Sequence, residues 1–322
     1  MTTGRSRPAG RTELARRGVR LLLERGLLST AEIHRYGLTA RDVSQSNGVA
    51  LVELGSGHGF AVKDLAPNRE PGQGDPAREV ELYRVATTSP DLAGRVPRLL
   101  LHDEDERLLV LEGVLAARRL DLQHEPTGAP FATELGTTLG LWHRVSTGLD
   151  ALGPARPWVL DLDGPARPAV IDRSEQLAAL VAEILSDERH TAALSRMRDT
   201  WTDDVTLHGD VRFANVLVRP HGVATLVDWE YAGAGDALWD VAGAVQEYVS
   251  AGETLDGAPV VALLAAYEAA RGAAVDRTRL TAFVAGRLLV RALQLLSWMT
   301  DPGAEVERHR ALARQVLEPV PA

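Results

Sequence analysis

The first 113 residues contain short apolar runs separated by turn residues, a pattern typical of β-strands. These runs predict strands at residues 41–45, 49–54, 60–64, 98–102 and 108–112. Residues 77–87 carry apolar side chains at helical spacing and predict a helix after the third strand. Two further helices are predicted ahead of the sheet, at 12–25 and 29–36, with Ser29 and Thr30 as cap candidates for the second. The pattern indicates a five-stranded antiparallel sheet with one inserted helix.

After residue 113 the strand signal fades, and long amphipathic or buried helices are predicted instead. Their ranges are 131–145, 172–185, 238–249, 260–271 and 278–299. One non-helical island, residues 205–228, interrupts them. Two short strands are expected within it, at 216–219 and 224–228.

The order of these elements indicates the fold class. A sheet followed by helices, without βαβ alternation, is typical of an α+β protein. We expect a tail and helical extension over residues 1–40, a sheet lobe over 41–113 and a mostly helical lobe over 114–322. The proline-rich stretch 153–168 is expected to be a surface loop or insertion.

Composition excludes several classes of protein. The chain has 35 Lys and Arg against 44 Asp and Glu, and the net charge of −9 falls on residues 114–322, which argues against a nucleic-acid partner. Without cysteine there are no disulfides or thiolate sites, and the nine His form no close ligand pair. We expect no membrane span and no signal peptide, and hence a cytoplasmic protein. Seven arginines in the first 25 residues form either a solvated tail or a docking surface.

One basic residue stands apart from the others. Of the 35 basic residues, Lys63 is the only lysine. Arginine is a planar fork, whereas lysine is a compact point charge on a flexible stem. Because Lys63 directly follows the apolar run 60–62, we expect a site that requires an amine at this position.

The island contains His208-Gly209-Asp210, with Asn215 five residues after the aspartate and Asp228 at the end of the next predicted strand. Phosphoryl transfer requires a carboxylate that accepts the proton of the attacking hydroxyl, and oxygen ligands that hold Mg²⁺. The kinase catalytic loop has the same spacing of aspartate and asparagine, with a second aspartate downstream. Lys63 and a glutamate of the following helix supply the ion pair that grips the α- and β-phosphates.

These motifs resemble, in their order, the aminoglycoside phosphotransferase and choline kinase group of kinase-like enzymes. The resemblance covers about residues 41–300 and includes the turn 44–48, the hinge-like strand 109–113 and the segment 235–240. It implies a two-lobed protein-kinase-like fold, with a nucleotide-binding N-lobe and a C-lobe for catalysis and acceptor binding. It also implies ATP, with GTP not excluded, and Mg²⁺ as cofactors.

The resemblance assigns roles to individual residues. Asp210 would be the catalytic base, and Asn215 and Asp228 would complete the catalytic set as metal ligands. Nucleotide contacts are expected at Ser46, Asn47, Lys63, Glu79, Leu111, Glu112 and Val114. Glu81 competes with Glu79 as the partner of Lys63, and the family pattern favours Glu79. Supporting roles are expected for His208 as a bracket of the loop, Arg212 as a candidate contact of the γ-phosphate, and Asp236 and Asp240 as residues that cap and brace a helix start.

The acceptor is left open. The acidic helical lobe suits a small cationic acceptor such as an aminoglycoside or an amino alcohol, as in enzymes of antibiotic resistance, biosynthesis or metabolism. Segments 211–215, 227–233 and 247–250 are also similar to kinases that phosphorylate Ser or Thr of a precursor peptide ahead of a partner lyase, in lanthipeptide or thioamitide-type pathways. A pseudokinase scaffold is the third alternative, which the intact motifs disfavour. An ordinary protein kinase is disfavoured because the G-x-G-x-x-G and A-P-E motifs are absent.

Overall fold

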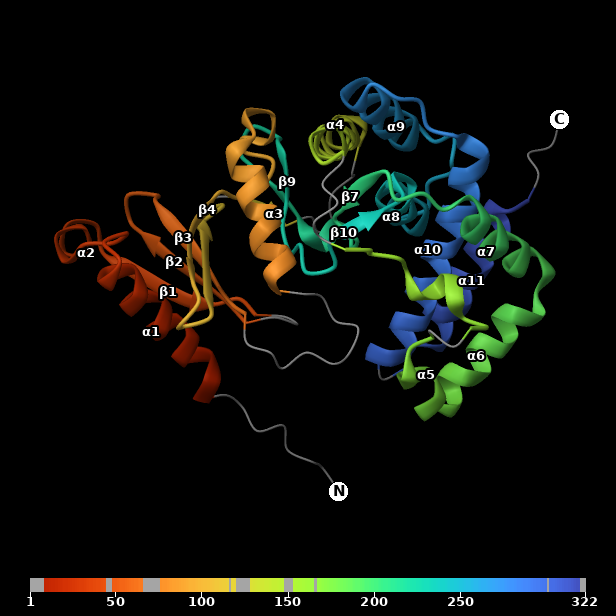
Figure 1. Ribbon diagram of the computed structural model, residues 1–322, viewed down its shortest axis with the longest axis horizontal. Helices are drawn as coiled ribbons and strands as arrows, with labels where there is room; N and C mark the ends of the chain where they lie inside the picture. The colour runs from red at the N-terminus through yellow and green to blue at the C-terminus, as the bar shows by residue number, and fades with distance from the viewer. Residues whose placement is uncertain are drawn as a thin grey trace. The chain divides into compact units, whose positions relative to one another are not determined.

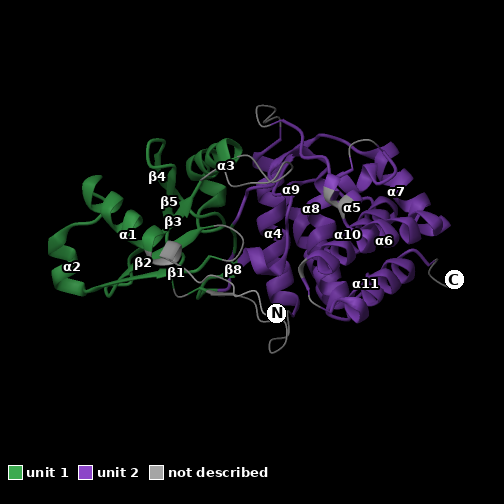
Figure 2. Cartoon of the chain, turned by 90° about the horizontal axis from the view of Figure 1, so that it is seen from below, with its two compact units in different colours: residues 1–118, 217–221, 225–227 green, residues 119–216, 222–224, 228–322 purple. Residues whose placement is uncertain are grey.

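The chain is described here by a computed structural model that defines residues 9–44, 48–65, 76–115, 117–119, 128–147, 153–164, 167–299 and 301–318. It divides into two compact units (Figure 2). Unit 1 comprises residues 1–118, 217–221 and 225–227, and unit 2 comprises residues 119–216, 222–224 and 228–322. Each unit is described separately below.

Unit 1 contains a five-stranded antiparallel sheet in the order β1-β2-β3-β5-β4. Its strands are β1 (Leu38–Asp42), β2 (Val49–Leu54), β3 (Gly59–Asp64), β4 (Leu99–Asp103) and β5 (Leu108–Glu112). Helix α3 (Pro76–Thr88) lies between β3 and β4 in the chain, so the predicted sheet with one inserted helix is confirmed. Strand β1 starts and ends three residues earlier than the predicted range, because it pairs with residues 50–54 of β2.

Alternation along β3 places two helices on opposite faces of this sheet (Figure 1). Val62 faces helix α1 (Ala9–Glu24), where a Cβ built on Gly18 would lie 3.1 Å from the Val62 side chain. The next residue, Lys63, faces α3. Helix α2 (Thr30–Tyr36) follows α1 and begins with a capping box in which Ser29 and Glu32 satisfy each other's backbone N–H groups.

The basic N-terminal segment takes part in this packing. Arg17 pairs with Asp64 and Glu106, at 3.1 and 3.5 Å, and Arg20 pairs with Glu106 at 2.7 Å. Arg25 pairs with the buried carboxylate of Asp103. These three arginines therefore attach α1 and its C-terminal turn to the sheet, which argues against a freely available docking surface at their positions.

Unit 2 is mostly helical. Its helices are α4 (Ala129–Val145), α5 (Ala169–Arg173), α6 (Glu175–Ser186), α7 (Glu188–Thr200), α8 (Ala237–Ser250), α9 (Ala258–Arg271), α10 (Arg277–Trp298) and α11 (Gly303–Val316). The predicted helix 172–185 is interrupted at Ser174, whose hydroxyl accepts the N–H of Leu177 and starts α6. Helices α7 and α11 are absent from the prediction because they bury only a few residues each and lack a continuous apolar stripe.

Residues 205–235 form short strands, of which β8 and β9 belong largely to unit 1. Strand β7 (Val205–Leu207) pairs with β10 (Gly233–Gly235), and neither was predicted as a strand. The island also forms β8 (Val216–Val218) and β9 (Ala224–Leu226), which lie in one sheet with β6 (Arg118–Arg119) and agree with the two predicted strands.

The prediction for residues 153–168 is wrong in part. Residues 158–161 form a 3₁₀ turn, and Val159, Leu160 and Leu162 are almost completely buried. Proline content correctly signals irregular backbone here, but the apolar side chains between the prolines belong to the core.

Two features define the core of unit 2. Helices α4 and α9 pack closely because Gly136 and Gly140 have no side chains, and a Cβ on Gly136 would lie 2.1 Å from a carbonyl oxygen of α9. Helix α10 lies among α6, α7, α8 and α11 (Figure 1). Within the described residues it is the one helix whose length and composition would allow a membrane span. Because 72% of that apolar window is buried inside the protein, α10 has the character of a core helix.

Candidate active site

Unit 1 contains a buried ion pair. Lys63 of β3 and Glu79 of α3 approach to 2.7 Å between Nζ and Oε1, with exposed fractions of 4% and 0%. Glu81 lies on another face of α3, is only partly buried and pairs with Arg84 at 3.2 Å. The structure thus places Glu79, and not Glu81, beside the only lysine. The second oxygen of Glu79 is buried without a hydrogen-bond partner among the described residues.

The hinge-like end of β5 contributes backbone groups. Leu111 is buried, and the N–H of Glu112 donates to the carbonyl of Arg98. The Glu112 carboxylate accepts from Arg219 at 3.2 Å. Within the described residues the N–H of Val114 has no acceptor, so it is the backbone donor that this segment leaves available. The predicted phosphate-turn residues Ser46 and Asn47 lie outside the described residues.

In unit 2, Asp210 follows β7, and the loop then makes a 3₁₀ turn at residues 213–215. The Asn215 amide donates from Nδ2 to the Asp210 carbonyl and to its carboxylate oxygen Oδ2, each at 3.0 Å. Arg212 Nε lies 3.0 Å from the same carboxylate oxygen, and the Asp210 side chain keeps 15% of its surface exposed. The carboxylate is therefore held by neighbours in its own loop and still reaches solvent.

Backbone conformation constrains both aspartates. Gly209 has φ of +84°, and a Cβ there would lie 2.3 Å from the carbonyl oxygen of Tyr231, so only glycine fits this position. Asp228 has φ of +68°, a left-handed conformation that is strained for a residue with a side chain. Such strain is concentrated at functional sites.

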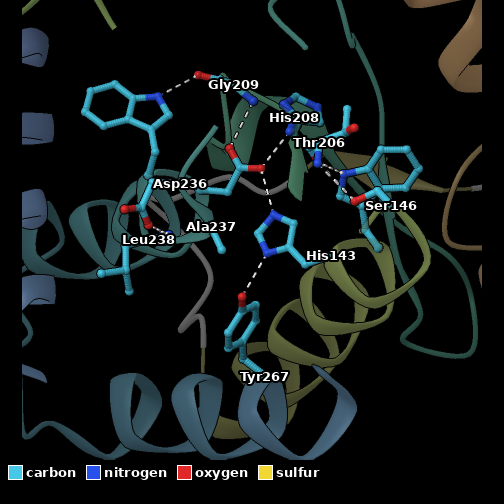
Figure 3. Close-up of polar contacts among 12 residues, drawn as sticks. His143, Ser146, Thr206, His208, Gly209, Asp236, Ala237, Leu238 and Tyr267 are labelled. Carbon is cyan, nitrogen blue, oxygen red and sulfur yellow. Dashed lines mark hydrogen bonds and ion pairs between the residues drawn. The ribbon is translucent and has the colours of Figure 1, made fainter. Parts of the chain in front are cut away.

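A buried carboxylate accepts hydrogen bonds from the backbone of the loop at His208 and Gly209 (Figure 3). Asp240 accepts the N–H of His208 at 2.6 Å and that of Gly209 at 2.9 Å. His208 is fully buried, and its Nδ1 accepts the N–H of Asp210 at 3.3 Å, which agrees with the expected bracket. The helix cap of α8 is Asp236, which accepts from Leu238. The expectation for Asp240 needs correction, because its carboxylate accepts from the loop that precedes Asp210 and does not cap the helix.

Asp240 is itself held by residues that the sequence analysis missed. His143 of α4 lies 3.1 Å from Asp240 through Nε2 and 2.9 Å from the hydroxyl of Tyr267 through Nδ1 (Figure 3). Arg271 donates to that hydroxyl at 2.7 Å. Arginine only donates, so the tyrosine proton is directed to Nδ1 and His143 donates from Nε2–H to Asp240. A lone histidine in an apolar helical pattern was the only signal in the sequence for this contact.

The electrostatic setting of Asp240 fits this arrangement. Burial by itself raises the pKa of Asp240, but the hydrogen bonds from His143 and from the backbone N–H of His208 outweigh it and lower the pKa below the ordinary value. Asp240 is therefore a carboxylate that is ionised and fully engaged. This makes it a fixed acceptor for the loop and leaves no free oxygen for a ligand.

A second group of acidic side chains follows β9. Glu230 is buried, whereas the residue Tyr231 is 39% exposed. Burial raises the pKa of Tyr231 to about 12, with further contributions from the charges of Glu230, Asp210 and Asp228. Tyr231 thus lies in the field of three carboxylates, two of which, Asp210 and Asp228, belong to the predicted site.

The fold and these two sets of residues define a class of protein, the kinase-like phosphotransferases. Residues 38–283 match the model of the family described as "Phosphotransferase enzyme family". Because the match spans most of the chain, the protein belongs to this family, and the resemblance inferred from the sequence is confirmed. No curated protein matches the chain significantly.

Solved structures agree with this assignment. Choline kinase LicA from Streptococcus pneumoniae has a TM-score of 0.64 at 16% identity, with 94% of this chain and 99% of that chain covered. A ternary complex of aminoglycoside phosphotransferase APH(4)-Ia with ADP and hygromycin B has a TM-score of 0.54 at 16% identity, covering 92% and 98%. Amicoumacin kinase hAmiN, in complex with AMP-PNP, Ca²⁺ and Ami, has a TM-score of 0.58 at 13% identity, covering 92% and 93%. At these identities the likeness shows the kinase-like fold, as predicted.

Proposed function

We propose that this protein is an ATP-dependent kinase that transfers the γ-phosphate to a hydroxyl of a small cationic acceptor. The observation that carries the proposal is the Asp210 carboxylate, which reaches solvent while Asn215 and Arg212 hold it in place. A carboxylate so fixed is suited to orient an acceptor hydroxyl and to take its proton.

Asn215 and Asp228 are the proposed ligands of Mg²⁺. The Nδ2 group of Asn215 is committed to Asp210, so its Oδ1 oxygen is directed elsewhere and is free to act as a ligand. An amide oxygen and a carboxylate suit Mg²⁺, which takes oxygen ligands and is usually completed by waters and phosphate oxygens. When bound, the metal would neutralise charge on the phosphates. Among the described residues, no cluster of three or more His, Asp or Glu forms an alternative metal site.

The nucleotide side of the proposal rests on unit 1. Lys63 is buried, and its amine donates to the Glu79 carboxylate, which fixes the direction of that amine. In this role Lys63 binds the α- and β-phosphates, and the N–H of Val114 binds the base. Relatives solved with ADP and with AMP-PNP support a nucleoside triphosphate as donor.

The acceptor is proposed to be cationic because of the surroundings of Asp210. Tyr231 is a partly exposed aromatic residue in the field of Glu230 and Asp228, and cations bind favourably to aromatic faces and to carboxylates. The similar structures include a choline kinase and an aminoglycoside complex, which points to amino alcohols and aminoglycosides as the first compounds to test.

The test is a transfer assay on the purified protein with Mg²⁺ and ATP. Amino alcohols, aminoglycosides and Ser/Thr peptides are offered in parallel, ADP release is measured, and products are identified by mass spectrometry. The Asp210→Asn variant should lower kcat by roughly 10²- to 10⁴-fold with little change in ATP affinity, since a general base contributes about that much. Wild-type turnover in this variant would contradict the role of Asp210.

The same assay decides between acceptor classes. Phosphate transfer to peptides alone would overturn the small-molecule proposal in favour of the precursor-peptide alternative. The structural argument for that alternative has weakened, because Arg17, Arg20 and Arg25 already pair with carboxylates of unit 1.

A further inference from the structure

We propose that Arg287 of α10 is a positioning residue that fixes the backbone on both sides of Asp210. Its catalytic consequence rests on the proposed phosphotransfer, whereas the structural contact stands by itself. None of the sequence motifs includes this arginine. It lies 77 positions after Asp210, in a helix whose apolar pattern is typical of a core helix.

The contacts of Arg287 are made to backbone atoms of the catalytic loop. Its Nη2 donates to the carbonyl of Val211 at 3.0 Å, and its Nη1 approaches the carbonyl of Gly209 at 3.4 Å. The Gly209 carbonyl also accepts from Trp239 Nε1 at 3.1 Å. The guanidinium carbon lies 4.7 Å from the centre of the Trp239 ring, so the fork is held against an aromatic face while it binds the loop.

The neighbouring helix leaves space for this contact. A Cβ on Gly243 of α8 would lie 2.8 Å from the Val211 carbonyl oxygen and 2.9 Å from Nη2 of Arg287. Gly243 adopts ordinary helical backbone, so its conformation does not require glycine. The missing side chain instead allows the guanidinium to reach the carbonyl.

The charge of Arg287 is costly where it lies. Only 6% of its surface is exposed, and no carboxylate of the described residues forms an ion pair with it. Burial lowers the pKa of Arg287, and the charges of Asp210, Asp240 and Glu247 oppose that effect from a distance. An apolar side chain would fill this space without the free-energy cost of burying a charge. The guanidinium is therefore explained by its hydrogen bonds to the loop.

Arg287 and Asp240 hold complementary halves of the same loop. Asp240 accepts the N–H groups of His208 and Gly209, which precede Asp210. Arg287 donates to the carbonyls of Gly209 and Val211, which lie before and after Asp210. Peptide groups that flank the catalytic carboxylate are thus bound to one anionic and one cationic side chain, and this sets the direction in which the Asp210 side chain leaves the backbone. A misplacement of about 1 Å at such a site costs on the order of 10²-fold in rate.

The test compares three variants with the wild type. Arg287→Met removes the donors, Arg287→Lys keeps the charge without the fork, and Gly243→Ala disturbs the same contact from α8. The control is Arg277→Met, on the same helix, which loses an exposed pair with Glu268 and does not contact the loop. Amide hydrogen exchange of peptides that cover residues 205–216 is measured together with kcat and the KM for ATP.

We expect exchange in this loop to be about 10-fold faster in Arg287→Met and in Gly243→Ala, while α8 and α10 stay protected. We expect kcat to fall by roughly 10²-fold with the KM for ATP within about threefold of wild type, and Arg287→Lys to recover only a small part of the rate. The Arg277→Met control should match wild type in all readouts.

Unchanged loop exchange in the Arg287 variants, full activity of Arg287→Lys, or the same changes in Arg277→Met would overturn the proposal. If Arg287→Met does not fold, the outcome of Arg287→Lys and Gly243→Ala decides. Hydrogen exchange does not require turnover, so a protein without phosphotransferase activity would refute the proposed function and still give an answer on the Arg287 contact.

Discussion

Replacing Asp240 by Asn tests its hydrogen bonds to the catalytic loop. Asp240 Oδ2 accepts from His208 N–H and from His143, at 2.6 and 3.1 Å, and Oδ1 accepts from Gly209 N–H at 2.9 Å. In Asp240→Asn the better orientation keeps the oxygen at the Oδ2 position, where it serves two donors. The amide nitrogen then faces the N–H of Gly209, and both donors are left without an acceptor.

The expected magnitude follows from these contacts. A buried donor left unsatisfied costs about 1–3 kcal/mol, and a charged acceptor contributes roughly 1 kcal/mol more per hydrogen bond than a neutral one. With two donors left unsatisfied and two bonds weakened, Asp240→Asn should lower the free energy of unfolding by about 4–8 kcal/mol. Because Gly209 directly precedes Asp210, kcat should fall by on the order of 10²-fold even where the protein is fully folded.

The assay is urea unfolding followed by circular dichroism. The kcat is measured without urea, at a temperature where both proteins are folded. Asp276→Asn is the matched control, because Asp276 is an exposed carboxylate that caps α10 and asparagine caps equally well. Its free energy of unfolding should change by less than about 0.5 kcal/mol. A loss below about 1 kcal/mol in Asp240→Asn, together with wild-type kcat, would refute the reasoning from the three hydrogen bonds.

Two further predictions concern buried ionisable groups. Lys63→Arg should fold but lose most of its turnover, because a planar guanidinium does not reproduce the contact that the Lys63 amine makes with Glu79 at 2.7 Å. Lys63 is only 4% exposed, so a larger head group has little room to adjust. Wild-type kcat in this variant would remove the argument from the single lysine. His190 is fully buried, and burial is the largest effect on its pKa, which it lowers. The unfolded chain therefore binds the proton more readily than the folded protein. Stability is lost as the pH falls below the ordinary histidine pKa of about 6.5. His190→Leu should therefore lose less stability than wild type between pH 7.5 and 5.5 in urea unfolding, and equal losses in the two proteins would contradict this assignment.

Features that depend on neighbouring residues were predictable from the sequence. The five strands and the inserted helix follow from alternation and turn residues, and the capping box at Ser29 is contained in four consecutive positions. The pairing of Asp210 with Asn215 follows from a spacing of five residues within one loop. The preference for Glu79 over Glu81 came from the family pattern, and helical geometry explains it, since residues two apart point to different faces.

Contacts between distant elements were decided only by the tertiary structure. His143 reaches Asp240 across 97 positions, and Arg287 reaches Val211 across 76, because α4 and α10 pack against α8 and the loop. In the sequence both residues are polar interruptions of apolar helices, and no local rule distinguishes such a residue from one that reaches the surface. The same holds for Arg17 and Arg20, whose charges indicated a tail or a docking surface until α1 was seen to lie on the sheet. Local pattern fixes which elements form, whereas the partner of a buried charge depends on how those elements pack, and packing is a property of the whole chain.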